Sequence, residues 1–182
     1  SRIVEAAVEF MHNFPDRSLG IVTLNKQQCS HINEKMERVM EQDPTVANYI
    51  QKWSDGLASF FIKNLENVQG DERDVIFIGT VYGADSATGK LSLNFGPVAQ
   101  NGGPRRLNVL FTRARERIVT FSSMSPSDIQ PGSSGSQGVR MLKSWLEYCE
   151  SGGKTLSTLS NEIKVESPFV SYVAKHIEAM GC

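Results

Sequence analysis

The sequence lacks the features of a membrane protein, a disulfide-stabilised protein or a strongly basic nucleic-acid-binding protein. No apolar run approaches the length that crosses a bilayer, and no signal peptide opens the chain. The three cysteines are odd in number and widely separated, without the spacing of a zinc site, so we expect reduced thiols in a cytoplasmic protein. Nineteen Lys and Arg against twenty Asp and Glu leave a net charge of −1, so any nucleic-acid site must be a local patch.

The chain also lacks the phosphate-binding loop of an independent ATPase. The run Gly152-Gly-Lys-Thr155 matches only the end of G-x-x-x-x-G-K-[ST], because Tyr148 stands where the first glycine belongs and an apolar helical stripe precedes it. We therefore interpret Gly152 as a helix C-cap. No predicted strand ends in the Asp-Glu pair that holds Mg²⁺. The three histidines are scattered, so we assign no metal ligand in this chain.

What is present is an alternation of strands and helices. Short apolar, β-branched runs predict strands at 18–24, 60–65, 74–81 and 117–122. Helical spacing of apolar residues predicts helices at 3–11, from Asn25 to Pro44, at 46–53 and at 105–115, with a loop at 83–103. This alternation predicts an α/β fold with three α/β/α layers and a mostly parallel sheet, in which strand 74–81 is central because it is apolar on both faces.

The composition changes after Ser125. Residues 125–138 are rich in Ser, Gly and Pro, which predicts a flexible loop, and residues 139–153 have the stripe of a helix that packs on the domain. Residues 154–182 are predicted to be a polar linker followed by a C-terminal helical extension. The chain opens on Ser1 and closes within an apolar helical pattern, so we expect it to be a piece of a longer protein.

The first segment with chemistry is a polar turn between two apolar strands, from Asn64 to Ile76. Loops at strand ends are where α/β sheets bind ligands. Gly70 lets the backbone approach a ligand closely, and Glu72 offers a carboxylate to a ribose hydroxyl. Asn67 and Gln69 carry uncharged donors suited to a phosphate or a sugar edge. The spacing alone equally allows a polar turn without a ligand.

The second segment is a basic cluster that the net charge hides. Five arginines stand against one glutamate between Arg105 and Arg117. If 105–115 is one helix, Arg106 and Arg113 are two turns apart on one flank of its buried stripe. Guanidinium groups suit phosphate because they present a fixed fork of donors. Without further information, a solvated helix face is the commoner interpretation.

Together the two segments resemble a known family. The run 65–76 resembles motif V of superfamily 1 helicases, 105–115 resembles motif VI, and 20–27 resembles motif IV. The motifs stand in the family's order, and the resemblance spans residues 1–123. The most similar branch is the Upf-type one, in particular large bacterial helicases with a C-terminal endonuclease-like domain. The resemblance implies that residues 1–124 form a second RecA-like domain of the P-loop NTPase type.

The resemblance also implies roles for residues at the nucleotide. The arginine of the Thr-Arg-Ala run reaches the ATP γ-phosphate in the family, and here it is Arg113. Gly70 and Glu72 take the place of the motif V residues in the nucleotide pocket, and Gln69 and Arg106 help to couple this pocket to the strand site. ATP and Mg²⁺ would be held mainly by a first RecA-like domain, so we expect this chain alone to be inactive as an ATPase.

For nucleic acid, the resemblance places Thr23, Asn25 and Asn67 along the backbone of a single strand, with DNA favoured over RNA. Two positions depart from the pattern. Asn25 stands where an aromatic residue is common, and Asp71 stands where Upf-type proteins often have a basic one.

The run 166–170 resembles the entry to an endonuclease fold like that of very-short-patch-repair enzymes, but no Asp…Glu-x-Lys core follows it. We therefore expect no nuclease activity from this chain. Another hypothesis is a non-catalytic scaffold or regulatory domain of a repair or defence protein that retains the RecA-like fold.

Overall fold

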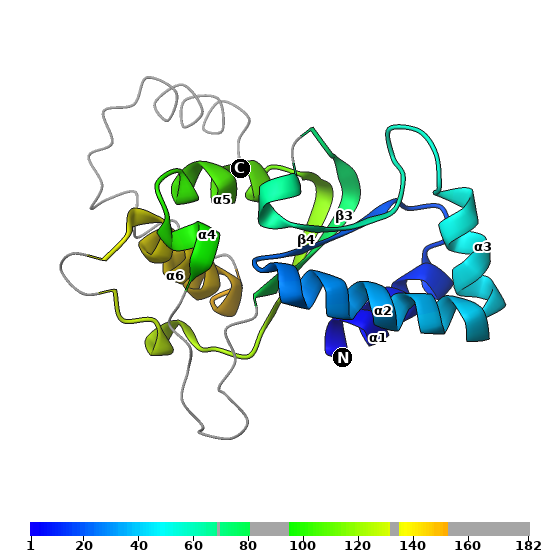
Figure 1. Cartoon of the computed structure of the whole chain (residues 1–182), viewed down its shortest axis with the longest axis horizontal. Coiled ribbons are helices and arrows are strands. Elements are labelled where there is room, and N and C mark those ends of the chain that lie inside the picture. The colour runs from blue at the N-terminus through cyan, green and yellow to red at the C-terminus, as the bar shows by residue number, and fades with distance from the viewer. Residues whose placement is uncertain (69, 81–94, 132–134, 153–182) are drawn as a thin grey trace. The chain divides into compact units, whose positions relative to one another are not determined.

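The computed structural model describes residues 1–68, 70–80, 95–131 and 135–152 of the 182-residue chain (Figure 1). Residues 1–146 form one compact unit that contains the sheet and the helices on both of its faces. A second unit comprises residues 147–182, of which only 147–152 are described. Among the described residues, no helix is long and apolar enough to cross a membrane.

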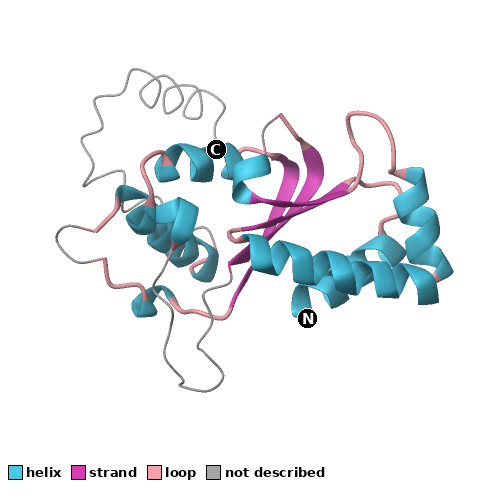
Figure 2. Ribbon diagram, in the orientation of Figure 1, coloured by secondary structure: helices cyan, strands magenta, loops and turns pink. Residues whose placement is uncertain are grey.

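The sheet has four parallel strands in the order β2-β1-β3-β4 (Figure 2). The strands are β1 Leu19–Thr23, β2 Phe61–Asn64, β3 Arg73–Thr80 and β4 Ala114–Ser122. β3 pairs with a neighbour on each side, and residues 75–80 are all buried. The predicted α/β class, the parallel sheet and the central place of 74–81 are therefore confirmed.

Three helices cover one face of the sheet: α1 Arg2–Asn13, α2 Lys26–Gln42 and α3 Pro44–Lys52. Their apolar stripes pack against alternate strand residues such as Ile21 and Phe77. α2 begins as predicted, because the Asn25 side chain accepts a hydrogen bond from the Gln28 N–H at 2.9 Å. Asp43 caps α3 in the same way through the N–H groups of Thr45 and Val46.

The opposite face is covered by α4 Gly96–Ala99, α5 Gly103–Phe111 and α6 Gln137–Glu150 (Figure 2). Two glycines allow these helices to meet closely. A Cβ atom on Gly103 or on Gly138 would lie 2.0 Å from the carbonyl oxygen of Val98, which no side chain tolerates. α5 and α6 therefore both rest on the backbone of α4, and the buried side chains of Leu107 and Leu142 join one core.

The helix predicted at 105–115 is shorter in the structure. α5 ends at Phe111, and β4 begins at Ala114, which lies opposite Arg73 of β3. Pairing with β3 outweighs the helical propensity of the arginine-rich run. The expectation that Arg106 and Arg113 share one helical flank is therefore wrong, since Arg113 lies between the helix and the strand.

The segment after β4 also differs from the expected loop. Within 125–138, Pro126–Asp128 form a 3-10 helix with a reciprocal capping box between Ser125 and Asp128, and Ile129 is fully buried. The predicted loop at 83–103 contains α4 within its described part. Gly152 has φ +64°, the left-handed conformation predicted for a helix C-cap. The linker and helix predicted at 154–182 lie outside the described residues.

Candidate nucleotide and strand sites

The parallel strands divide the predicted site residues between two ends of the sheet. All strands start at one end, the amino end, where Arg73 opens β3 and Arg113 precedes β4. All strands finish at the other, the carboxyl end, where Thr23 closes β1 and Asn64 closes β2. Residues 65–68 follow β2 at the carboxyl end, and residues 70–72, here called the return loop, lead into β3 at the amino end. Glu72 and Arg113 are thus brought to one end, and Thr23, Asn25 and Asn67 to the other.

Arg113 is held by its backbone and by one atom of its guanidinium group. Its Nε donates to the carbonyl oxygen of Val109 at 3.0 Å, and its backbone N–H donates to Leu110 at 3.1 Å. Its carbonyl oxygen accepts from the N–H of Arg73 at 3.1 Å. Within the described part of the chain, neither terminal guanidinium nitrogen has a partner. The half-buried side chain is therefore oriented while its fork of donors is left for an anion.

Glu72 lies beside Arg115 at the same end. The Arg115 Nε is 3.8 Å from a Glu72 carboxylate oxygen, and both side chains are about half exposed. Such a pair contributes little because water screens it, so the carboxylate can accept a hydrogen bond from a ligand hydroxyl at low cost. Gly70 precedes it with φ +83°, so this position of the return loop does require glycine.

Asp71, which departs from the expected motif V pattern, has a local counter-charge. Its carboxylate accepts from the Lys63 ammonium of β2 at 2.7 Å and lies 3.9 Å from the guanidinium of Arg73. The negative charge of Asp71 is therefore compensated by Lys63 and Arg73 of the same chain.

The sequence interpretation missed Arg73. Its side chain is only 1% exposed, although it opens a strand at the amino end. The guanidinium donates to the carbonyl oxygens of Leu57, Ser59 and Glu72 at 2.9, 2.6 and 2.6 Å. Burial lowers the pKa of Arg73, although arginine stays protonated in proteins. The available signal was a single arginine within the acidic run Asp71-Glu72-Arg73-Asp74, directly before the apolar part of a strand.

Asp74 anchors β3 to the segment before β1. Its carboxylate accepts from both the N–H and the hydroxyl of Ser18 at 2.8 Å, and its own N–H donates to that hydroxyl at 2.9 Å. Burial alone would raise the pKa of Asp74, but these hydrogen bonds and the charges of Arg115 and Arg17 hold it below its usual value. The amino ends of the two central strands are therefore fixed to each other.

Arg106 has a local role in the structure. Its Nη1 donates to the carbonyl oxygens of Pro97 at 3.1 Å and of Asn101 at 3.4 Å, which ties the start of α5 to the end of α4. None of its hydrogen bonds within the described residues reaches Arg113 or Glu72. The described hydrogen bonds of Arg106 therefore do not join it to the other predicted nucleotide residues.

At the carboxyl end, the three predicted strand contacts differ in accessibility. Thr23 is fully buried, and its hydroxyl donates to the carbonyl oxygen of Asn25 at 2.8 Å. Asn25 is half-buried, and its side-chain oxygen caps α2 by accepting the hydrogen bond from the Gln28 N–H. Asn67 is exposed at the end of the 3-10 helix Leu65–Asn67. Gln69, the remaining predicted residue, lies outside the described residues.

The carboxyl end also holds two buried oxygens without a donor. The side-chain oxygens of Gln28 and Asn64 are buried and have no hydrogen-bond partner within the described part of the chain. The Gln28 amide lies over Gly79 of β3, where a Cβ atom would come within 2.6 Å of its nitrogen. An unsatisfied buried acceptor costs about 1–3 kcal/mol, so this end of the sheet is not optimised for stability.

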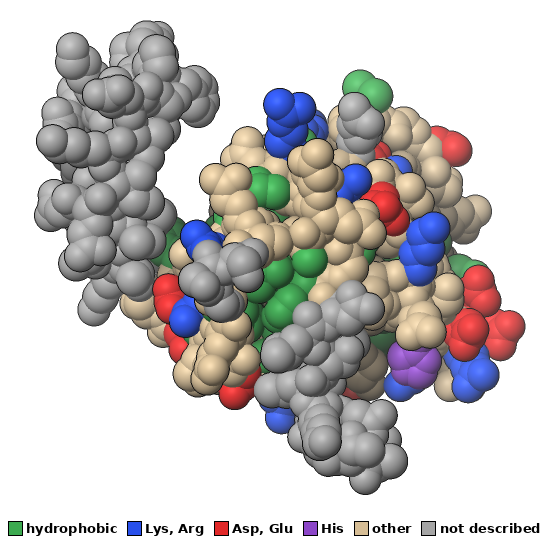
Figure 3. Space-filling model, turned by 60° about the vertical axis from the view of Figure 1, so that its left-hand side comes forward, with side chains coloured by type: hydrophobic (Ala, Val, Ile, Leu, Met, Phe, Trp, Pro, Cys, Tyr) green, Lys and Arg blue, Asp and Glu red, His purple; other side chains and the backbone are tan. Residues whose placement is uncertain are grey.

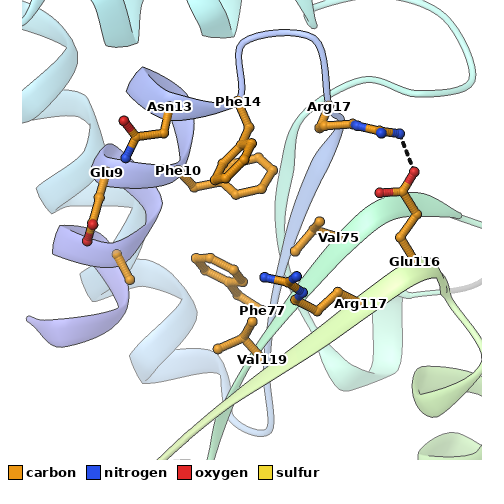
Figure 4. Close-up of a pocket in the computed structure, with 11 residues that line it drawn as sticks. Glu9, Phe10, Asn13, Phe14, Arg17, Val75, Phe77, Glu116, Arg117 and Val119 are labelled. Atoms are coloured by element: carbon orange, nitrogen blue, oxygen red, sulfur yellow. Dashed lines mark hydrogen bonds and ion pairs between the residues drawn. The ribbon is translucent and has the colours of Figure 1, made fainter.

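A separate cavity of about 440 Å³ lies between α1 and the start of β3 and β4 (Figure 4). Rings of Phe10, Phe14 and Phe77 line it, and the ion pair between Arg17 and Glu116 lies at its rim. None of the predicted site residues lines this cavity. On the face shown in Figure 3, acidic and basic side chains are interspersed, in keeping with the small net charge.

Comparison with known sequences identifies the family of this chain. The sequence model of a family described as AAA domain matches residues 1–125. The chain belongs to this family. The chain is 36% identical over 141 residues to an uncharacterized ATP-dependent helicase of Mycoplasma genitalium, with 76% of this chain and 12% of that relative covered. The Mycoplasma pneumoniae homologue of that helicase is also 36% identical over 141 residues, covering 74% of this chain and 12% of the relative.

A more distant relative is the DNA polymerase alpha-associated DNA helicase A of Saccharomyces cerevisiae. It is 25% identical over 150 residues, with 81% of this chain and 17% of the relative covered. The aligned part of this chain therefore spans between 12% and 17% of the length of these relatives. Together with the parallel α/β sheet, the matches identify a helicase-type domain of superfamily 1.

Proposed function

We propose that the AAA domain is the second RecA-like domain of a cytoplasmic, Upf-type superfamily 1 helicase. ATP would lie between its amino end and a first RecA-like domain of the same polypeptide. The observation that carries this proposal is the state of Arg113, whose side chain is oriented by Val109 while both terminal nitrogens are free among the described residues. Glu72, at the same end, offers an exposed carboxylate for the ribose.

The described geometry supports an arginine-finger role. When the two domains close, the free fork of Arg113 would donate to the γ-phosphate and stabilise the charge that develops in phosphoryl transfer. Mg²⁺ and the loop that cradles the phosphates would be supplied mainly by the first domain. The AAA domain alone would show negligible ATPase activity, because it contributes only this half of the site.

Single-stranded nucleic acid would lie along the carboxyl end. Asn67 is exposed there, and Asn25 retains its amide N–H groups after capping α2. Thr23 would join only after a local opening, because its side chain is buried. DNA is favoured over RNA by the endonuclease-like run at 166–170 and by the name of the yeast relative, a DNA helicase. Gln69 and Arg106 would couple the two ends.

The test is strand-stimulated ATP turnover by the full-length protein, with Arg113→Ala compared with the wild type. We expect kcat to fall by about a thousandfold while nucleotide binding is retained, since the finger acts on the transition state. Arg38→Ala, on the exposed face of α2, is the matched control and should leave kcat unchanged. Unchanged turnover in Arg113→Ala contradicts the finger. A wild-type protein without strand-stimulated turnover favours the scaffold hypothesis instead.

A further inference from the structure

We propose that Arg73 is a positioning residue for the nucleotide: it fixes Glu72, and through Glu72 it determines the preference for ribose over deoxyribose in ATP. This inference rests on the proposed function, which gives Glu72 the ribose contact. The starting observation is that the charged side chain of Arg73 is buried, which costs free energy of desolvation. Arg73 is 1% exposed, and a buried guanidinium is tolerated only when its donors and its charge are satisfied.

The contacts of Arg73 join two separate segments. Nε and Nη1 donate to the carbonyl oxygens of Ser59 and Leu57, in the turn before β2. Nη1 also donates to the carbonyl oxygen of Glu72 at 2.6 Å, in the return loop. The guanidinium carbon lies 4.6 Å from the centre of the Phe61 ring, which forms a floor beneath it. One side chain therefore holds the end of the return loop against the turn before β2.

These contacts act on Glu72 through its backbone. The Glu72 side chain has one charged neighbour among the described residues, Arg115 at 3.8 Å, and both are about half exposed. That weak pair cannot fix the direction of the carboxylate. The carbonyl group of Glu72 is fixed, however, by the short bond to Arg73. The place from which the carboxylate extends is consequently set by Arg73.

The same residue is joined to the arginine finger. The backbone N–H of Arg73 donates to the carbonyl oxygen of Arg113 at 3.1 Å. This bond belongs to the main chain and survives any substitution of the side chain except proline. Replacement of the Arg73 side chain should therefore disturb Glu72 while leaving Arg113 in place, which separates an effect on KM from an effect on kcat.

Lysine is the informative replacement. It keeps the positive charge beside Asp71. Its ammonium has only one nitrogen, however, so it cannot replace the separate Nε and Nη1 donors that reach the turn before β2 and the carbonyl of Glu72. We expect Arg73→Lys to fold and to lose the fixed geometry of Glu72.

The experiment measures kcat and KM of the full-length protein with ATP and with 2′-deoxy-ATP, at saturating single-stranded DNA. The wild type should prefer ATP in kcat/KM by at least about tenfold, the value of one hydrogen bond to a charged group. Arg73→Lys should lose most of this preference through a higher KM for ATP, with kcat within about threefold of the wild type. Arg38→Lys, on exposed α2, is the matched control and should keep the wild-type preference.

Glu72→Gln separates the two proposals. If it removes the preference and the double variant with Arg73→Lys shows no further loss, Arg73 acts through Glu72, as proposed. If Glu72→Gln removes the preference while Arg73→Lys retains it, the role of Arg73 is overturned and the nucleotide site stands. If the wild type shows no preference and Glu72→Gln leaves KM unchanged, the ribose contact itself is wrong, and the inference about Arg73 falls with it.

A second variant protects the test against a folding defect. Phe61→Leu removes the ring beneath the guanidinium but keeps an apolar side chain in β2 and every hydrogen-bond acceptor. Circular dichroism and thermal unfolding would show whether each variant is folded. If Arg73→Lys does not fold, Phe61→Leu decides: a reduced preference for ATP supports the inference, and a wild-type preference overturns it.

Discussion

The two ends of the sheet are built differently. At the amino end, charged side chains are paired with backbone groups and with each other: Asp74 with Ser18, Arg73 with two loops, and Arg17 with Glu116. At the carboxyl end, the amide oxygens of Gln28 and Asn64 are buried without a hydrogen-bond partner among the described residues. The end proposed to meet ATP is therefore preorganised, whereas the other end keeps buried acceptors without a donor.

The largest expected effect on stability is at Arg73. Arg73→Met should lower the free energy of unfolding of this chain by about 3–5 kcal/mol, because it leaves buried carbonyl groups without their donor and removes the buried charge beside Asp71. Urea unfolding followed by circular dichroism measures the change. Arg38→Met, on the exposed face of α2, should change the free energy by less than about 0.5 kcal/mol. Equal effects of the two substitutions would mean that the amino end is not specially fixed.

A smaller, pH-dependent effect is expected at Asp74. Its pKa is lowered in the folded state, so its stabilising effect is present above the unfolded pKa of about 4 and is lost as the pH falls through the folded value. Asp74→Asn should therefore cost about 1–2 kcal/mol at pH 7 and progressively less as the pH falls below about 4. Unfolding of both proteins between pH 7 and pH 3 tests this. A difference that stays constant with pH would contradict the role of the carboxylate.

At the carboxyl end, removal of a polar group should not lower the stability. Gln28→Met keeps the length of the side chain but removes the unsatisfied oxygen, so we expect stability to be unchanged or to rise by about 1 kcal/mol. Thermal unfolding with and without single-stranded DNA measures the change. A loss of more than about 1 kcal/mol would show that the amide is already satisfied in solution, and the contrast between the two ends would disappear.

The smallest effect is expected in the turn that Arg73 holds. The Leu57 side chain is 95% exposed, although its carbonyl oxygen accepts from Arg73. Leu57→Ser keeps this carbonyl, so the free energy of unfolding should change by less than about 0.5 kcal/mol. Urea unfolding of Leu57→Ser and of the wild type measures this change. A larger loss would mean that the side chain, and not the backbone, holds this turn.

Much of the fold could be predicted from local patterns. The strand 74–81 was recognisable because it is apolar on both faces, and Asn25 could be recognised as the cap of α2 from the spacing to Gln28. The end of α5 could not be predicted locally, because β4 begins where it finds β3, and this pairing joins residues far apart in the sequence. The family resemblance nominated Arg113, but its position between α5 and β4 emerged only from this pairing.

The accessibility of the site residues was also beyond the sequence. Thr23 is buried because β1 lies between two other strands, and a single strand's pattern does not reveal its neighbours. Arg73 was missed for a related reason. Its hydrogen-bond acceptors are carbonyl groups of the turn at 57–59. Every residue has a backbone carbonyl, so the sequence does not indicate which ones accept.

The packing of Gly138 against Val98 bears on where this domain can be cut for expression. The match to the AAA domain family stops at residue 125, but Ile129, Leu142 and Leu146 lie in the same core as the sheet. A protein trimmed at the family boundary would expose that core and remove the contact of Gly138 with the Val98 carbonyl. The smallest fragment able to fold must therefore reach at least to Leu146, some twenty residues past the point suggested by homology.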